Sequence, residues 1–76
     1  MEAFAHGYYT HKGNKYKTLK SGTKDGLVTS KNVFFEIWES SVLYTRVEKE
    51  LEKVYCRELK EFKEMFTLKQ KYLPTI

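Results

Sequence analysis

The sequence predicts an α+β fold in which a small antiparallel sheet is followed by a C-terminal amphipathic helix. Residues 7–45 are rich in Tyr, Thr, Val and Phe and contain glycine-bearing turns, which is typical of strands joined by hairpins. From about residue 46 the apolar residues recur at helical spacing instead. The 76 residues suffice for a single domain, 1–76, with a β-sheet part over 7–45 and a helical part over 46–71.

The first half of the chain begins with a predicted β-hairpin. Residues 7–10 and 15–20 are rich in Tyr and Thr, and residues 12–14 between them are a turn signal. A second polar connection with two glycines, residues 21–26, leads into a short predicted strand at 27–29.

The strongest predicted strand covers residues 33–38, where β-branched and aromatic residues follow one another. Residues 39–41 supply a hairpin link into a further strand at 42–45. Phe35 and Trp38 are expected in the core, so replacing either of them by Ala should unfold so small a domain. The alternative is that this aromatic strand is a recognition surface, and such a variant then stays folded but loses binding.

The spacing of the apolar residues changes after Thr45. Thr45 and Glu48 have the spacing of a capping box at a helix start. At about 100° per residue, the apolar side chains that follow fall within an arc of roughly 140°. They are Val47, Leu51, Val54, Tyr55, Leu59, Phe62, Met65 and Phe66. The pattern predicts an amphipathic helix that runs to about Lys71 and stops before Leu73 and Pro74.

A continuous helix of this length would be roughly 39 Å long, which is more than a domain of this size covers. It therefore either breaks near Cys56 and Arg57 or projects toward a partner. An alternative for the same stretch is a strand at residues 54–56 between two short helices.

Charge is distributed unevenly along the chain. Residues 1–31 hold six lysines against two acidic residues, whereas residues 32–76 hold eight basic and eight acidic residues. The whole net charge of +4 therefore lies in the first half. In the second half acidic and basic residues alternate along the helical pattern, which is typical of a solvated helix face.

No pattern in the sequence indicates catalysis. Cys56 is the single cysteine, and the two histidines, His6 and His11, have no catalytic signature around them. These histidines also lack a second ligand pair at a zinc spacing, and the four glycines are scattered at turns rather than gathered in a phosphate-binding loop. The chain is therefore expected to be non-enzymatic, with no metal and no cofactor.

The cysteine count and the hydropathy pattern suggest a location. A single cysteine excludes an internal disulfide framework and points to a reducing compartment. The first residues have neither the basic nor the apolar region of a signal peptide, and no apolar run approaches roughly 18 residues. A cytoplasmic protein without a membrane partner is expected.

Three short motifs lie within residues 7–51. They are His11-Lys12-Gly13-Asn14-Lys15-Tyr16, Val33-Phe34-Phe35-Glu36 and Tyr44-Thr45-Arg46-Val47. With them this stretch resembles a small bacterial and phage family of unknown function, whose members show a His-Lys-Gly-Asn-x-Tyr opening, a central aromatic strand and a Tyr-x-Arg-Pro close. Val47 stands in place of the family's proline. The resemblance implies a bent, SH3-like sheet that ends in a short helix, and it supplies no chemistry.

The predicted helix is the first candidate surface for binding. Tyr55, Leu59, Phe62 and Phe66 follow a 4-3-4 spacing that suits packing on the chain's own sheet or a seam with a second chain. We therefore expect a protein-binding module, either with another protein or as a homodimer through this helix. Its size and its resemblance suggest a phage or mobile-element accessory protein that modulates or inhibits a host protein, whose identity the sequence does not give.

The basic, Tyr-rich N-terminal half is the second candidate surface. Lysines meet phosphates, and exposed aromatic rings stack on bases. The alternative function is therefore nucleic-acid binding, and its predicted contacts are Lys12, Lys15, Tyr16, Lys17 and Lys20. The competing interpretation is that the tyrosines belong to the core and that the lysines keep a sheet edge soluble.

Overall fold

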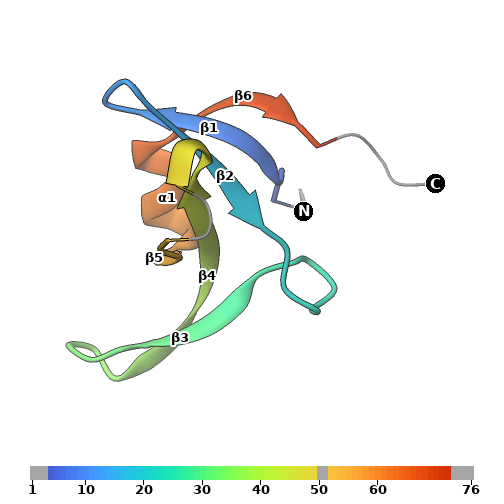
Figure 1. Cartoon of the computed structure of the whole chain (residues 1–76). Helices are drawn as coiled ribbons and strands as arrows, with labels where there is room; N and C mark the ends of the chain where they lie inside the picture. The colour runs from blue at the N-terminus through green and yellow to red at the C-terminus, as the bar shows by residue number, and fades with distance from the viewer. Residues whose placement is uncertain (1–3, 50–51, 73–76) are drawn as a thin grey trace.

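The computed structural model describes residues 4–49 and 52–72. In order along the chain, its elements are β1 (Gly7–His11), β2 (Asn14–Leu19), β3 (Val28–Asn32), β4 (Ile37–Arg46), the 3-10 helix η1 (Val47–Lys49), β5 (Tyr55–Glu58), α1 (Leu59–Met65) and β6 (Thr67–Lys71). In this part of the chain the fold is mostly β, with six strands in one antiparallel sheet (Figure 1). The strand order is β3-β4-β2-β1-β6, and β5 pairs with β4.

β1 and β2 form the tight hairpin that the sequence predicts. Lys12 and Gly13 connect the two strands, and both have a positive φ, 49° and 80°. Two successive positive φ values are typical of a type I′ turn, whose twist matches that of the strands beside it. The register places Tyr9 opposite Tyr16, so the two rings share the face that becomes the core.

β4 is the central strand because, in the described residues, it pairs with three others, β2, β3 and β5. Its first half pairs with β3, from Ile37 opposite Asn32 to Ser41 opposite Val28, and its second half pairs with β2. Ser41 also pairs with Glu58 of β5, and one strand edge accepts one neighbour at each residue. β3 and β5 therefore lie on opposite edges of β4. Leu43 and Tyr44 of β4 likewise pair with both β2 and β5, so β2 also lies on the edge opposite β5. β3 and β2 therefore pair with successive parts of the same edge of β4.

An aromatic core lies between the sheet and α1. Its buried members are Phe4, Tyr9, Leu27, Val42, Tyr44, Phe62 and Phe66, and the half-buried residues packed against them are Tyr16, Tyr55, Leu59 and Met65. Phe62 is the centre of the cluster and is 0% exposed. Its ring centroid lies 4.2–5.7 Å from those of Phe4, Tyr9, Tyr44 and Phe66. Such ring pairs contribute about 0.5–1.5 kcal/mol each beyond the area they bury.

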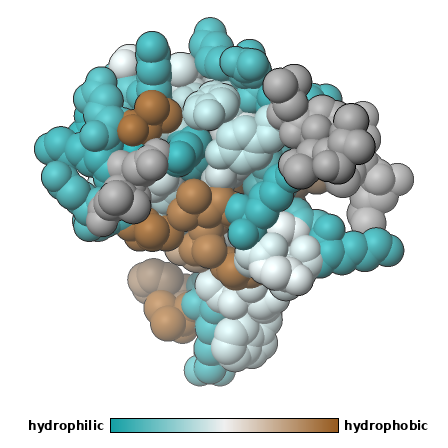
Figure 2. Space-filling view, turned by 45° about the vertical axis from the view of Figure 1, so that its right-hand side comes forward, coloured by the Kyte–Doolittle hydropathy of each residue, from teal (hydrophilic) through white to brown (hydrophobic). Residues whose placement is uncertain are grey.

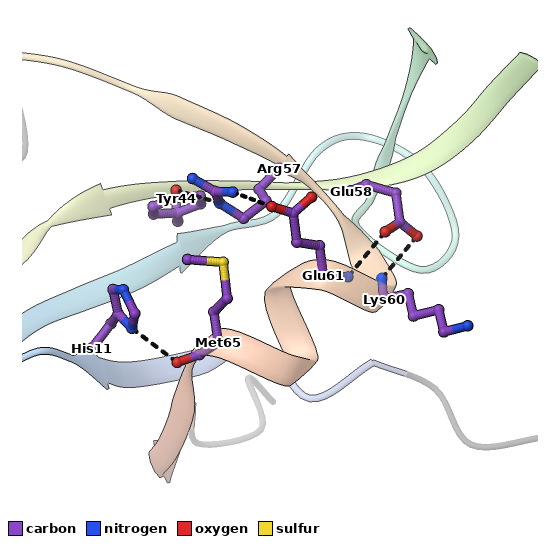
Figure 3. Close-up of polar contacts among 7 residues, drawn as sticks. All are labelled: His11, Tyr44, Arg57, Glu58, Lys60, Glu61 and Met65. Carbon is purple, nitrogen blue, oxygen red and sulfur yellow. Dashed lines mark hydrogen bonds and ion pairs between the residues drawn. The ribbon is translucent and has the colours of Figure 1, made fainter. Parts of the chain in front are cut away.

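α1 is a seven-residue helix that begins at a side-chain cap. The Glu58 carboxylate accepts hydrogen bonds from the backbone N–H groups of Lys60 and Glu61, each at 2.9 Å (Figure 3). These bonds satisfy two of the amide donors that the first helical turn leaves without a partner.

Side-chain contacts tie both ends of α1 to the sheet. Arg57 on β5 donates to the Glu61 carboxylate at 2.5 Å and to the Tyr44 hydroxyl at 3.3 Å (Figure 3). At the other end, the His11 ring on β1 hydrogen-bonds to the Met65 carbonyl oxygen at 3.0 Å. A helix of two turns is marginal by itself, so packing and these contacts hold it in place.

The predicted α+β arrangement, a bent, SH3-like sheet followed by a C-terminal amphipathic helix over residues 46–71, is wrong. The structure has one short α-helix in the described residues, and along the chain β5 precedes it and β6 follows it. The apolar spacing is helical only within α1, where Leu59, Phe62 and Met65 meet the core. In β5 and β6, pairing with β4 and β1 outweighs helix propensity, which is a weak preference that tertiary contacts override.

The alternative prediction for residues 54–56 is closer to the structure. β5 is a strand, and it lies between the 3-10 helix η1 and α1. Thr45 does not cap a helix, because it belongs to β4 and its hydroxyl donates to the Lys53 carbonyl oxygen at 2.8 Å. Leu51, Leu73 and Pro74, which the helix prediction also used, lie outside the described residues.

β6 forms one edge of the sheet by pairing with β1. The two backbones approach closely at Gly7, where a Cβ atom would lie only 2.1 Å from the Gln70 carbonyl oxygen. Glycine at this position therefore permits the pairing. Among residues 4–49 and 52–72, no helix has the length and apolar character needed to cross a bilayer.

Candidate functional site

A long hairpin extends from the sheet. We call it the arm, and it consists of β3, the first half of β4 and the loop between them, residues 28–41. In Figure 1 the arm reaches to the lower left, away from α1, β1 and β6. Its strands pair from Val28 opposite Ser41 to Asn32 opposite Ile37, and residues 33–36 form the connecting loop.

The end of the arm exposes five large apolar side chains. We call residues 33–38 the hairpin tip. The exposed fractions are 77% for Val33, 90% for Phe34, 73% for Phe35, 50% for Ile37 and 68% for Trp38. Figure 2 shows hydrophobic atoms, in brown, at the lower left of the molecule, in the part that the arm forms. Single exposed apolar residues are common, but five within six positions form a patch, and such patches mark interaction sites.

Asn32, just before the loop, and Glu36, its last residue, define the conformation of the loop. The Asn32 side-chain oxygen accepts hydrogen bonds from the backbone N–H groups of Phe34, at 2.9 Å, and Phe35, at 3.1 Å. A side chain used in this way replaces a backbone partner and defines a turn. Glu36 closes the loop with a φ of 54°, a left-handed conformation that costs a non-glycine residue about 1–2 kcal/mol. The aromatic side chains are therefore presented on a defined turn.

The base of the arm is continuous with the core. Leu27, just before β3, is 5% exposed, and Val42, next along β4, is fully buried. Ser41 is fully buried as well, and its hydroxyl hydrogen-bonds to the Ser30 hydroxyl at 2.5 Å. Because β4 runs without a break from the tip to the core, the arm is an extension of the sheet.

The charges beside the tip are mixed. Lys31 pairs across the strands with Trp38, whereas Glu36 lies in the loop and Glu39 follows on β4. Residues 28–41 thus carry one positive and two negative charges. A carboxylate among the aromatic side chains repels phosphates and anionic lipids. The electrostatics of the tip therefore favour an apolar contact over an anionic one.

The residues predicted to bind a partner through the helix lie in or against the core. Phe62 and Phe66 are 0% and 7% exposed, and their rings stack at a centroid distance of 4.2 Å. Tyr55 and Leu59 pack against the same cluster. The structure therefore brings the four side chains together at the core, with Phe62 and Phe66 buried in it and Tyr55 and Leu59 half-buried beside it.

The opposite correction applies to residues 33–38. The predicted buried strand is an exposed turn followed by the start of β4, and Phe35 and Trp38 lie outside the core. The predicted hairpin link at 39–41 lies within β4 instead. One local signal could have located the turn, because Asn32 is of the residue types favoured at the first position of a turn.

The residues predicted for nucleic-acid contact fall on two faces of the β1–β2 hairpin. Tyr16 points into the core, where its ring lies 5.6 Å from that of Tyr44 and 5.1 Å from that of Phe66. The four lysines are at the surface, with Lys12, Lys15 and Lys20 exposed and Lys17 half-buried. Strand alternation places Lys15 and Lys17 on the face opposite Tyr16. The structure therefore separates Tyr16 from this set.

The histidines join parts of the fold to one another. The His6 ring hydrogen-bonds to the Thr18 hydroxyl at 3.0 Å and to the Asp25 carbonyl oxygen at 2.8 Å, and His11 hydrogen-bonds to a carbonyl oxygen of α1. Cys56 is exposed on β5. In the part of the chain that the structure describes, no group of three or more His, Cys, Asp or Glu side chains is arranged to hold a metal ion.

The chain matches no protein-family model, no curated protein and no solved structure. The resemblance of residues 7–51 to a bacterial and phage family stays a prediction. The surface features of this chain are thus the basis for assigning a function.

Proposed function

We propose that the chain is a non-enzymatic protein-binding module and that the hairpin tip is its contact surface. The observation that supports this is the exposure of five large apolar side chains on a turn of defined conformation. Covering apolar surface is the main favourable contribution to most protein association. Fully burying a side chain of this size contributes about 1.5–3 kcal/mol.

The tip has the properties of an energetic centre in an interface. A few aromatic residues near the middle of a contact supply most of the binding energy in typical complexes, and Phe34, Phe35 and Trp38 are three such residues within five positions. Holding a loop in its bound conformation also reduces the entropy lost on association. The two hydrogen bonds to Asn32 provide that restraint.

The expected partner is a protein with an apolar pocket or groove. An aromatic loop of this kind can also enter a lipid surface, but an anionic membrane attracts lysines placed beside the loop. Here Glu36 is part of the loop itself, and residues 28–41 have one more negative than positive charge. The phage or mobile-element origin and the inhibition of a host protein stay predictions from the sequence.

The test compares the hairpin tip with two exposed apolar side chains elsewhere. The tip variant is Phe34→Ser/Phe35→Ser, and the matched control is Val54→Ser/Leu68→Ser, which alters side chains that are 54% and 36% exposed away from the arm. Wild type and both variants are immobilised, incubated with nuclease-treated bacterial lysate, and the captured proteins are quantified by mass spectrometry. We expect at least one protein to be captured equally by the wild type and the control, and its captured amount to fall by about tenfold or more with the tip variant.

Two outcomes contradict the proposal. One is capture that the tip variant retains, and the other is capture that the control loses to the same extent. Both variants should keep the wild-type melting temperature, because neither pair of side chains is in the core.

Trp38 gives a direct readout of which surface covers the tip. It is the single tryptophan of the chain, and it is 68% exposed. Its fluorescence should shift to shorter wavelength when the purified partner is added, because the ring leaves water. Vesicles of phosphatidylcholine and phosphatidylserine should produce no shift. A shift with vesicles and none with the protein would indicate that the tip binds a lipid surface instead of a protein.

A further inference from the structure

A second surface, unrelated to the tip, lies on the part of the sheet formed by β1, β2 and β6. Residues 8–20 and 67–72 contain six lysines and no acidic residue, whereas the rest of the chain holds eight basic and ten acidic residues. The positive charge is therefore concentrated on three neighbouring strands. We call this surface the basic sheet.

Strand pairing assembles the basic sheet from the two ends of the chain. β6 pairs with β1, and β1 pairs with β2, as Figure 1 shows at the top of the molecule. This pairing adds Lys69 and Lys71 to the lysines of the first hairpin. Positive charges closer together than a Debye length of about 10 Å repel one another, and a bound polyanion relieves that repulsion.

A hollow of about 500 Å³ lies on the basic sheet. The lining side chains that matter here are Tyr8, Thr10, Lys15, Lys69 and Gln70. Its volume falls in the range of about 300–1,000 Å³ that is usual for sites that hold one small organic group. Tyr8 is 40% exposed and alternates away from the buried Tyr9, so its ring is available on this face.

We infer that the basic sheet binds single-stranded nucleic acid. In this arrangement Lys15 and Lys69 meet backbone phosphates, and an unpaired base occupies the hollow against the Tyr8 ring. Stacking on an aromatic ring requires a base that is free of its own duplex partners, which favours a single strand over a double helix. The 19 residues of the two stretches include no arginine for bidentate reading of base edges, so binding should tolerate different sequences.

The surface continues beyond the hollow along the same side of the sheet. The Tyr72 ring meets Tyr8 edge to face at a centroid distance of 5.3 Å, and the Lys20 ammonium lies 5.9 Å from the Tyr72 ring centroid. Aromatic rings interleaved with lysines are the usual composition of sites that follow a nucleic-acid strand. The hairpin tip differs because its loop carries a carboxylate.

The experiment measures fluorescence anisotropy of a labelled oligothymidylate of about 12 nucleotides between about 50 and 200 mM salt. The test variant is Lys15→Gln/Lys69→Gln. Its matched control, Lys60→Gln/Lys63→Gln, removes the same charge from exposed positions of α1. We expect the test variant to reduce the slope of log K against log salt by about 1.4, which is about 0.7 for each phosphate that it no longer neutralises, and the control to leave the slope unchanged.

A third variant examines stacking separately from charge. Tyr8→Leu keeps an apolar side chain but removes the ring, and it should weaken binding about fivefold or more with no change in the salt slope. All variants should melt at the wild-type temperature, because the altered side chains are exposed.

The inference is overturned by any of three results. The first is an equal loss of affinity in the α1 control, which would indicate a general effect of net charge. The second is a duplex of the same length that binds as tightly as the single strand. The third is thymidine monophosphate binding as tightly as the oligonucleotide, which would make the hollow a nucleotide pocket.

Discussion

Aromatic side chains are buried at one end of the molecule, in the core around α1, and exposed at the other end, at the tip of the arm. At the core end Phe62 is 0% exposed among four other rings, whereas at the arm end Phe34 is 90% exposed. One strand connects the two environments, because β4 carries the exposed Ile37 and the buried Val42 and Tyr44. Residue type alone therefore does not decide which aromatic side chains form the core.

The difference between the ends is a second layer. At the core end α1 and the segment before β1 cover the sheet, so an inward side chain is enclosed on all sides. The arm is a two-stranded ribbon, and in the described residues its tip has no such cover. An isolated hairpin buries little surface, so apolar residues at its end add little to stability. They are available for binding instead.

The largest effect is expected at the core end. Phe62→Ala removes the central ring of the cluster, and losing a buried aromatic side chain costs about 3–5 kcal/mol. Small domains unfold with about 5–15 kcal/mol in total, so this variant should be largely unfolded or only weakly stable. Urea denaturation followed by circular dichroism measures the change. A midpoint close to that of wild type would show that the core does not depend on this ring.

A smaller and local effect is expected at the arm. Asn32→Ala removes the oxygen that accepts hydrogen bonds from the amides of Phe34 and Phe35. The net contribution of a hydrogen bond to stability is about 0.5–1.5 kcal/mol, so the turn loses about this much for each of the two. The loop should loosen while the core stays intact. Hydrogen exchange of these two amides should become faster, with a melting temperature close to that of wild type.

Asn14→Ala is the matched control for the arm. It removes an asparagine of the other hairpin, whose side-chain oxygen accepts a hydrogen bond from Arg46 at 3.1 Å. Exchange in residues 33–36 should not respond to it. Unchanged exchange of the Phe34 and Phe35 amides in the Asn32 variant would show that the tip does not depend on its turn.

The smallest effect is expected in the loop before β3, and it depends on pH. The hydrogen bond from the Leu27 backbone N–H, at 3.1 Å, is the main cause that lowers the pKa of Asp25 below its ordinary value, and the Thr23 hydroxyl acts in the same direction. A carboxyl with a lower pKa in the folded state stabilises the fold above its unfolded pKa of about 3.9 and loses that contribution as pH falls through the folded value.

Asp25→Asn should therefore lower the melting temperature slightly at pH 7 and reduce its dependence on pH below about pH 4. Because Asp25 is exposed, both differences should be small. Melting curves recorded across this pH range give the comparison. Identical pH profiles for wild type and variant would show that this carboxylate has no part in stability.

The sequence predicts the parts of the fold that depend on neighbouring residues. The β1–β2 hairpin follows from the local turn signal at Lys12 and Gly13. The helix predicted over residues 46–71 is wrong, and within it only the spacing of Leu59, Phe62 and Met65 corresponds to α1. The bounds of that helix do not follow, because residues 67–71 become a strand only when β1 lies beside them. Their pairing requires a glycine at position 7, some 60 residues away.

The candidate site could not be predicted for a related reason. Residues 33–38 have the composition of a buried strand, and the same composition suits an exposed recognition loop. What separates the two is whether a second layer covers them, and that depends on distant elements. The basic sheet was predictable only in part, since the N-terminal lysines are adjacent in sequence whereas Lys69 and Lys71 join them through β6.

The most direct test of the central claim is the free energy of unfolding of Phe34→Ser/Phe35→Ser. If the tip is a binding surface, two exposed rings can be replaced by polar side chains with a change within about 1 kcal/mol of wild type, as is usual for surface positions. Urea denaturation measures that difference, with Phe62→Ala as the reference for a core ring. A loss of about 3 kcal/mol or more would place the two tip rings in the core and contradict the account.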